Sequence, residues 1–333
     1  MNNSTAATTD SRDYTRAYIN NAIYITQGFI QIVGNVIIVI VVALCKDLQR
    51  REYILPTFLA VADTTIGVGL FSAGTYRLYV ILSGANEVWQ TSWQCFLTLH
   101  NQFFILGDFW IPLALLLISV DRTIACASIQ LYAGPRGKQI IKGMLAGGLL
   151  LSAVLYGLTV YSSRQALQFG ARFYAICYTS YALMPWFNTY VYWSYQSVLG
   201  VGCVLLYGVA MVTLRSHLAD SLGEALKRKQ ERQAKVTRML LVVMLFTAFL
   251  HTLPLTLMVY FNFLNSRPEV IDVVEPIASI LKNLNSEINI IIYVWKNKEI
   301  RVAVTKLLTG KVAAIYKGPS VHSTSIVPAN SNK

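Results

Sequence analysis

Seven long apolar stretches, separated by polar segments, dominate the 333-residue chain. A helix needs about 20 mostly apolar residues to cross a hydrocarbon core about 30 Å thick, and each stretch is long enough to do so. The stretches cover residues 22–45, 53–76, 88–120, 143–163, about 186–214, 239–266 and 276–295. The pattern predicts an all-α fold, a bundle of seven transmembrane helices.

The segment after the seventh stretch has a different pattern. Ile300, Val304, Leu307 and Leu308 recur at helical spacing among charged residues, so they share one face of a helix. We predict a short amphipathic helix on the membrane surface over residues 296–309. The rest of the chain is expected to divide into an extracellular segment (1–17), the membrane domain (18–295) and a flexible cytoplasmic tail (310–333).

Composition agrees with a membrane protein and excludes two other classes. Hydrophobic residues make up 55% of the chain and charged residues 13%, with a mean hydropathy of +0.49. Soluble domains carry about 25% charged residues, so neither a disordered chain nor a soluble enzyme fits. The five cysteines form no metal-ligand spacing, and we expect no cofactor.

The basic residues are distributed unevenly over the predicted loops. With the N-terminus outside, 21 of the 28 Lys and Arg residues fall in cytoplasmic segments, as the positive-inside rule requires. The net charge of +12 therefore reflects contact with an anionic leaflet rather than with nucleic acid. We expect a plasma-membrane protein with an extracellular N-terminus and a cytoplasmic C-terminus.

Two overlapping glycosylation sequons begin at Asn2 and Asn3. The expected orientation places both in the compartment where glycosylation occurs. Such short motifs also arise by chance, so an unmodified N-terminus stays an alternative.

Several polar residues lie at mid-membrane depth in the predicted helices. Asp63 is in the second helix, Asn35 is in the first, and Asn285, Ser286 and Asn289 are in the seventh. Because an ionisable side chain is costly there, we expect a buried hydrogen-bonded cluster around Asp63, with water or a sodium ion. The alternative is a set of interhelical hydrogen bonds that only hold the helices together.

Five motifs in the right order resemble those of rhodopsin-like G-protein-coupled receptors over about residues 20–310. They are Gly34-Asn35-Val36, Leu59-Ala60-Val61-Ala62-Asp63, Asp121-Arg122-Thr123, Pro254, and the segment 285–293 ending in Tyr293. The chain departs from the family at positions such as Thr123 and Ile290, where the family has Tyr and Pro. This divergent pattern resembles that of nematode serpentine chemoreceptors. The resemblance implies a ligand-activated chemosensory or neuropeptide receptor, not an enzyme, that signals to a heterotrimeric G protein.

The resemblance also implies roles for particular residues. It joins Cys95 to Cys177 by a disulfide, whereas the alternative leaves both as free buried thiols. It places G-protein coupling and switching on a set of residues near the cytoplasmic side: Asp121, Arg122, Tyr207, Asn289 and Tyr293. Arg122 also has a simpler interpretation, as a basic anchor that reaches the lipid headgroups.

The ligand pocket is expected near the extracellular side. Its candidate residues are His100, Phe104, Asp108, Trp110, Trp186, Tyr190, His251 and Lys282. Phe104 stands where amine receptors of the family carry an Asp, which disfavours a biogenic amine, and the unknown ligand is a small molecule or a peptide. The alternative for Asp108 and Lys282 is an ion pair that only holds helices together.

Two other functions compete with the receptor. A transporter or channel would use Asp63, Asp108 and Glu287 as a carboxylate relay across the membrane. An opsin-like photoreceptor would need its retinal-binding Lys at position 283, but Asn283 stands there and Lys282 is one residue away. One residue rotates a side chain by about 100° around a helix, so Lys282 would face elsewhere.

Overall fold

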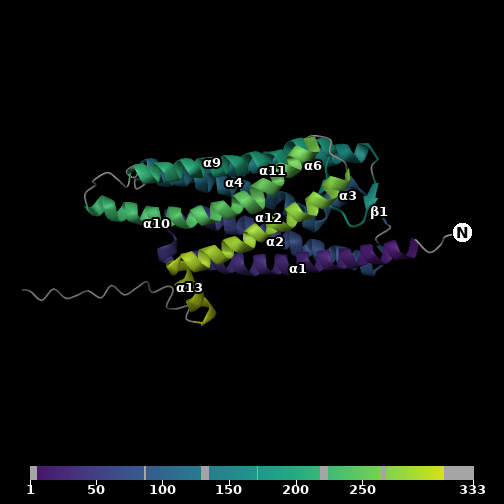
Figure 1. Ribbon diagram of the computed structural model, residues 1–333, viewed down its shortest axis with the longest axis horizontal. Helices are drawn as coiled ribbons and strands as arrows, with labels where there is room; N and C mark the ends of the chain where they lie inside the picture. Colours follow the sequence, from purple (N-terminus) through teal and green to yellow (C-terminus); the bar gives the residue numbers. More distant parts are fainter. Residues whose placement is uncertain are drawn as a thin grey trace, which may run out of the picture.

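A computed structural model describes residues 6–85, 88–128, 135–170, 172–217, 224–263 and 268–310. Long helices run side by side along the longest axis of the molecule (Figure 1). They are α1 (Ala6–Leu44), α2 (Arg51–Leu82), α4 (Leu99–Ala127), α6 (Pro135–Gln168), α9 (Ser194–His217), α10 (Glu224–Phe246), α11 (Leu253–Phe263) and α12 (Pro268–Lys296). The sequons at Asn2 and Asn3, and the tail from residue 311 onward, lie outside the described residues.

Shorter elements connect the long helices. They are η1 (Lys46–Leu48), β1 (Trp89–Thr91), α3 (Ser92–Leu97), β2 (Arg172–Tyr174), α7 (Thr179–Ala182), α8 (Pro185–Phe187), the π-helical turns η3 (Asn188–Trp193) and η4 (Thr247–Thr252), and α13 (Lys298–Leu308). Most of those between α2 and α9 gather at the end of the bundle where the N-terminus lies, and α13 lies at the opposite end (Figure 1). We call these the N-terminal end and the far end.

Six helical segments of the described chain are long and apolar enough to cross a membrane. They are Ala17–Leu44, Arg51–Leu82, Leu99–Ala127, Gln139–Gln168, Pro185–Ser216 and Val236–Phe261. The prediction of a multi-pass membrane protein is therefore confirmed. The seventh predicted stretch forms the helix α12, but α12 is not among the six, because polar residues such as Lys282, Asn283 and Glu287 lower its hydropathy.

The third apolar stretch differs from its prediction in both bounds. The apolar run at 88–120 does not form one helix, because Thr98 adopts an extended conformation (φ −63°, ψ 139°) that separates α3 from α4. At its other end, α4 continues to Ala127, seven residues beyond the predicted bound at Val120. Asp121 and Arg122 are therefore helical and buried inside the bundle rather than at a helix end.

A small antiparallel sheet, which the all-α prediction did not include, covers part of the N-terminal end. Trp89 of β1 pairs with Tyr174 of β2, and their rings stack at 4.8 Å. Thr91 caps α3 by accepting a hydrogen bond from the Gln94 backbone N–H, and the Gln94 side-chain oxygen accepts one from the Thr91 backbone N–H. This reciprocal cap fixes the point where the sheet ends and α3 begins.

Pro254 interrupts the sixth long helix as predicted. Proline has no N–H and its ring clashes with the carbonyl four residues earlier, so a regular α-helix cannot continue through it. The chain widens into the π-helical turn η4 just before this proline and resumes as α11. His251 lies in this turn and is buried.

Hydrogen bonds at the end of α12 fix the start of α13. The Asn297 side chain accepts from the backbone N–H groups of Glu299 and Ile300 and so caps α13. The same side chain donates to the Tyr53 hydroxyl of α2 at 3.0 Å, and Tyr53 donates to the Glu299 carboxylate at 3.1 Å. The direction in which α13 leaves the bundle is therefore set by α2.

Backbone atoms of α1 and α2 approach closely at Gly28 and Gly67. A Cβ atom added at Gly28 would lie 2.5 Å from the Phe71 nitrogen and 2.7 Å from the Gly67 carbonyl oxygen. Small residues allow membrane helices to approach in this way, where van der Waals packing supplies much of the stability. The apolar core of the bundle continues from this seam toward α4, α9, α10 and α12.

We expect Gly28→Ala to separate α1 from α2 and to destabilise the protein, because the backbone atoms in its way cannot rotate aside. Gly157→Ala on α6 is the matched control, since a Cβ there meets no atom within 4 Å. Thermal unfolding of both purified variants in detergent measures the difference. Equal midpoints for Gly28→Ala and wild type would show that the seam tolerates a methyl group.

Candidate functional site

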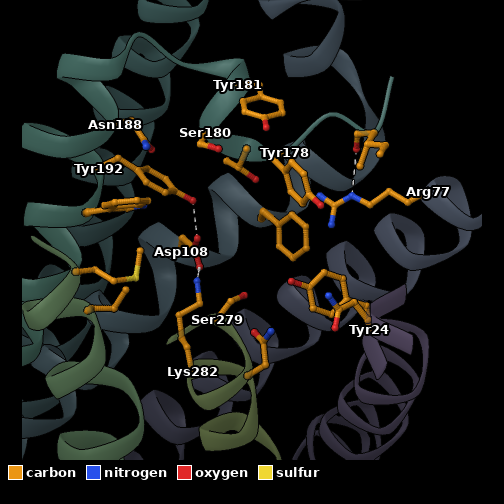
Figure 2. Close-up of a pocket in the computed structure, with 18 of the residues that line it drawn as sticks. Tyr24, Arg77, Asp108, Tyr178, Ser180, Tyr181, Asn188, Tyr192, Ser279 and Lys282 are labelled. Atoms are coloured by element: carbon orange, nitrogen blue, oxygen red, sulfur yellow. Dashed lines mark hydrogen bonds and ion pairs between the residues drawn. The ribbon is translucent and has the colours of Figure 1, made fainter. Parts of the chain in front are cut away.

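A cavity of about 390 Å³ opens at the N-terminal end of the bundle. This volume lies within the range of about 300–1,000 Å³ that small-molecule sites occupy. Its walls come from α1, α2, α4, η3, α9, α11, α12 and the segment after β2 (Figure 2). The lining combines aromatic and neutral polar side chains with three charged ones, Arg77, Asp108 and Lys282.

Asp108 and Lys282 form an ion pair on one wall of the cavity. The Lys282 ammonium Nζ lies 2.7 Å from Asp108 Oδ1, and both side chains are largely buried. The Tyr192 hydroxyl donates to the other carboxylate oxygen, Oδ2, at 2.5 Å. The Asp108 carboxylate thus has a partner for each oxygen, supplied by α12 and η3.

Arg77 lies on another side of the same cavity (Figure 2). Its Nε donates to the backbone carbonyl of Ile176 at 3.1 Å, and its Nη2 lies 3.5 Å from the carbonyl of Cys177. The rings of Tyr24 and Tyr178 are 5.7 Å and 4.4 Å from the centre of the guanidinium group. Arg77 therefore connects α2 to the segment that follows β2.

A disulfide between Cys95 and Cys177 holds that segment over the cavity. Two side chains of α4 strengthen the attachment. His100 Nε2 lies 3.0 Å from the Cys177 carbonyl, and Asn101 donates to the Cys95 carbonyl at 2.7 Å. The Thr179 hydroxyl in turn donates to Asn101 at 2.8 Å.

A polar cluster lies in the interior near Asp63. The Ser286 hydroxyl donates to Asp63 Oδ1 at 2.6 Å. Among the described residues, Asp63 Oδ2 and the side-chain amide of Asn289 are buried without a hydrogen bond. Asn35 donates to the Gln31 carbonyl of its own helix, and Asn285 accepts from Thr247; within the described structure neither side chain has a hydrogen bond to Asp63.

A charged cluster lies nearer the far end. The Asp121 carboxylate pairs with Arg122 through Oδ2, and Arg51 Nη2 lies 3.5 Å from its Oδ1. Arg122 is only 1% exposed. The Tyr207 hydroxyl donates to the Thr237 carbonyl and connects α9 to α10, while the nearby predicted residue Tyr293 is buried without a hydrogen bond in the described structure.

Comparison with protein families matches residues 28–308 to the family described as serpentine type 7TM GPCR chemoreceptor Srsx. The chain belongs to this Srsx family. The match covers the predicted membrane domain except its first residues, and it includes α13. A comparison with curated proteins gives no match. The resemblance to nematode serpentine receptors seen in the sequence is thus confirmed.

The Srsx cavity includes three of the eight predicted pocket residues, Phe104, Asp108 and Lys282. Among the others, His100 contacts the Cys177 carbonyl above the cavity, and His251 is buried in η4 without lining it. Trp110 packs on Phe58, with ring centroids 6.0 Å apart, between α4 and α2.

Trp186 and Tyr190 point away from the cavity of this Srsx chain, with exposed fractions of 47% and 57%. The physical reason is their position around the helix, because residues four apart share a face. Asn188, Tyr192 and Gln196 form the opposite face and line the cavity. The predicted segment therefore lines the cavity, but through Asn188, Tyr192 and Gln196 rather than through Trp186 and Tyr190.

Several lining residues of the Srsx cavity were absent from the prediction. Tyr24, Arg77, Tyr178 and Tyr192 belong to this group. Arg77 carried a usable signal, because an Arg directly after a predicted span is rare on the side that the positive-inside rule leaves poor in basic residues. Tyr178 carried none, since its place depends on the disulfide one residue earlier.

We expect Cys95→Ser and Cys177→Ser each to lower surface expression, and the double variant to be no worse than either single one. In the chain-entropy model, a bond that closes a loop of 82 residues stabilises the protein by about 4.5 kcal/mol. Flow cytometry of an N-terminally tagged receptor on intact cells measures the effect. Additive losses would contradict a shared bond.

Asp108→Asn and Lys282→Met should each destabilise the receptor, and the double variant should lose less than their sum. Removing one partner of a buried ion pair leaves the other charge unpaired, at a cost of about 3–5 kcal/mol, whereas removing both avoids that cost. Thermal unfolding in detergent tests this cycle. Lys296→Met is the control, since Lys296 is exposed on the same helix; a coupling near zero would contradict the pair.

Proposed function

We propose that this Srsx receptor lies in the plasma membrane with its N-terminus outside, binds a chemical signal in the cavity and couples to a heterotrimeric G protein at the far end. The family supports a chemosensory receptor. The cavity supports a small ligand because its volume and its mixed lining suit one.

One observation carries the proposal: two helices each contribute side chains both to the cavity and to the far end. On α4, Asp108 lines the cavity and Asp121 belongs to the far charged cluster, 13 residues or about 20 Å further along the helix. On α12, Lys282 lines the cavity, Ser286 bonds to Asp63, and Tyr293 is buried near the far end. If a bound ligand shifts either helix at the cavity, the side chains that the same helix places at the far end should move as well.

This arrangement supports α12 as the seventh span, although its hydropathy is low. Its polar residues Asn283, Asn285, Ser286 and Asn289 are buried within the bundle, so they need not meet lipid. The exposed side chain of Ile291 is apolar, as a lipid-facing position requires.

The next helix, α13, is proposed to lie on the inner membrane surface, as predicted for residues 296–309. Ile300 and Ala303 are buried against the bundle, while Arg301 and Lys298 are exposed. Basic side chains of this kind favour an anionic leaflet.

The Asp63 cluster remains the proposed place for water or a sodium ion. Asp63 Oδ2 and Asn289 Oδ1 are buried oxygens without hydrogen bonds among the described residues, and such hard oxygen atoms suit a small cation. Bound there, a cation would neutralise the carboxylate and join α2 to α12.

Asp121 is proposed to hold Arg122 in the inactive state. Release of the guanidinium would make its planar donors available to Tyr207, Tyr293 and the G protein. A ligand acts by favouring the state in which this release has occurred. The family match favours this mechanism over the carboxylate-relay transporter and over the opsin-like receptor.

We expect Asp121→Asn to raise basal G-protein signalling by about fivefold, the effect of a shift of about 1 kcal/mol between states. Adding Arg122→Lys should abolish this increase, because Lys lacks the planar fork. A promiscuous G-protein reporter at matched surface level measures both, without any ligand. Detection of an N-terminal tag on intact cells supplies the surface level and tests the orientation.

Arg215→Lys in the Asp121→Asn background is the control, since Arg215 is an exposed arginine near the end of α9. It should keep the raised basal signal. If the variant with Arg122→Lys also keeps it, Arg122 is only a basic anchor.

A further inference from the structure

The Arg77 guanidinium is a buried cation in the cavity wall whose described partners are all neutral. Arg77 is only 4% exposed. No carboxylate of the described residues lies within 4 Å of it, and its acceptors are the backbone carbonyls of Ile176 and Cys177. A buried charge is costly unless a counter-charge compensates it.

The surroundings of Arg77 orient its charge without neutralising it. The rings of Tyr24 and Tyr178 attract the cation through their electron-rich faces. A guanidinium has five N–H donors in a planar fork, and the two carbonyls use only part of them. The group is positioned by α2, held by the segment after β2, and directed at the cavity between the two tyrosines (Figure 2).

The other charges of the cavity cancel. Asp108 and Lys282 neutralise each other at 2.7 Å, and Tyr192 occupies the second carboxylate oxygen. Among the described lining residues, Arg77 then leaves a net charge of +1. Such a site attracts an anion and repels a cationic amine.

A second observation concerns the α9 side of the cavity. Asn188 and Gln196 line it, are both at least nine-tenths buried, and each has a side-chain oxygen without a hydrogen bond in the described structure. Unpaired buried amides of this kind are satisfied by a polar group of a ligand.

We propose that the ligand is a small organic carboxylate that pairs with Arg77 and carries a hydrogen-bonding group for Asn188 and Gln196. Arg matches a carboxylate with two parallel N–H···O bonds, which gives both affinity and orientation. This inference rests on the proposed function, since it names the ligand class of the same cavity.

The test measures thermal unfolding of the purified full-length receptor in lipid nanodiscs, without a G protein. The probes are octanoate, phenylacetate and para-hydroxyphenylacetate, each beside its methyl ester. At least one acid should raise the midpoint in a saturable manner while its ester does not, and the hydroxylated acid should act at the lowest concentration. No shift with any acid, or equal shifts with the esters, would overturn the proposal.

Arg77→Gln separates the ligand role from a purely structural one, because Gln can still donate to the carbonyls of Ile176 and Cys177. It should reach the cell surface and weaken the acid-dependent shift by tenfold or more in concentration. Arg172→Gln, which removes an exposed arginine of β2 at the same end, should leave the shift unchanged. An unchanged shift in Arg77→Gln would mean that the guanidinium only tethers the loop.

Arg77→Lys provides a second test of the ligand class if Arg77→Gln does not fold. It retains the charge, so the preference for acid over ester should persist at a lower affinity, and loss of that preference would overturn the proposal. The experiments distinguish a wrong ligand class from a wrong assignment of G-protein coupling. Missing acid shifts with intact basal signalling by Asp121→Asn would refute only the ligand class, whereas the reverse result would refute only G-protein coupling.

Discussion

A charged side chain inside a bundle of apolar helices needs a partner, and this requirement organises both ends of the receptor. At the N-terminal end, Asp108 joins α4 to α12 through Lys282. Nearer the far end, Asp121 joins α4 to α2 through Arg51. Both carboxylates belong to α4, so one helix carries the negative charges that the neighbouring helices must meet. These pairs add specific contacts between helices to the packing of the apolar core.

The two carboxylates differ in the number of basic side chains that contact them. The Asp108 pair is balanced, and the nearby surplus charge belongs to Arg77. In the far cluster, the Asp121 carboxylate contacts both Arg51 and Arg122, each through a different oxygen.

Hydropathy predicted the membrane class, because that class depends on the length of the apolar runs. The resemblance to a receptor family supplied the disulfide partners, and the mid-membrane depth of Asp63 and Ser286 indicated a shared polar cluster. The rotation of η3 was not predictable, because the same apolar composition surrounds Trp186 and Asn188 and only packing decides which one faces inward. Arg51 was not predictable for a related reason: its position two residues before the second apolar stretch indicates a cytoplasmic loop charge, whereas its side chain turns back into the bundle to reach Asp121.

The glycine seam between α1 and α2 has a consequence for stiffness. At Gly28, the atoms of α2 that lie nearest to an added Cβ all belong to the main chain of Gly67 and Phe71. Such a contact has no alternative rotamers to adopt, so it cannot slide by small repacking steps in the way that interdigitated leucines can. This close approach restricts the sliding of α1 against α2. The segment before Pro254 differs, because a π-helical turn there interrupts the regular helix.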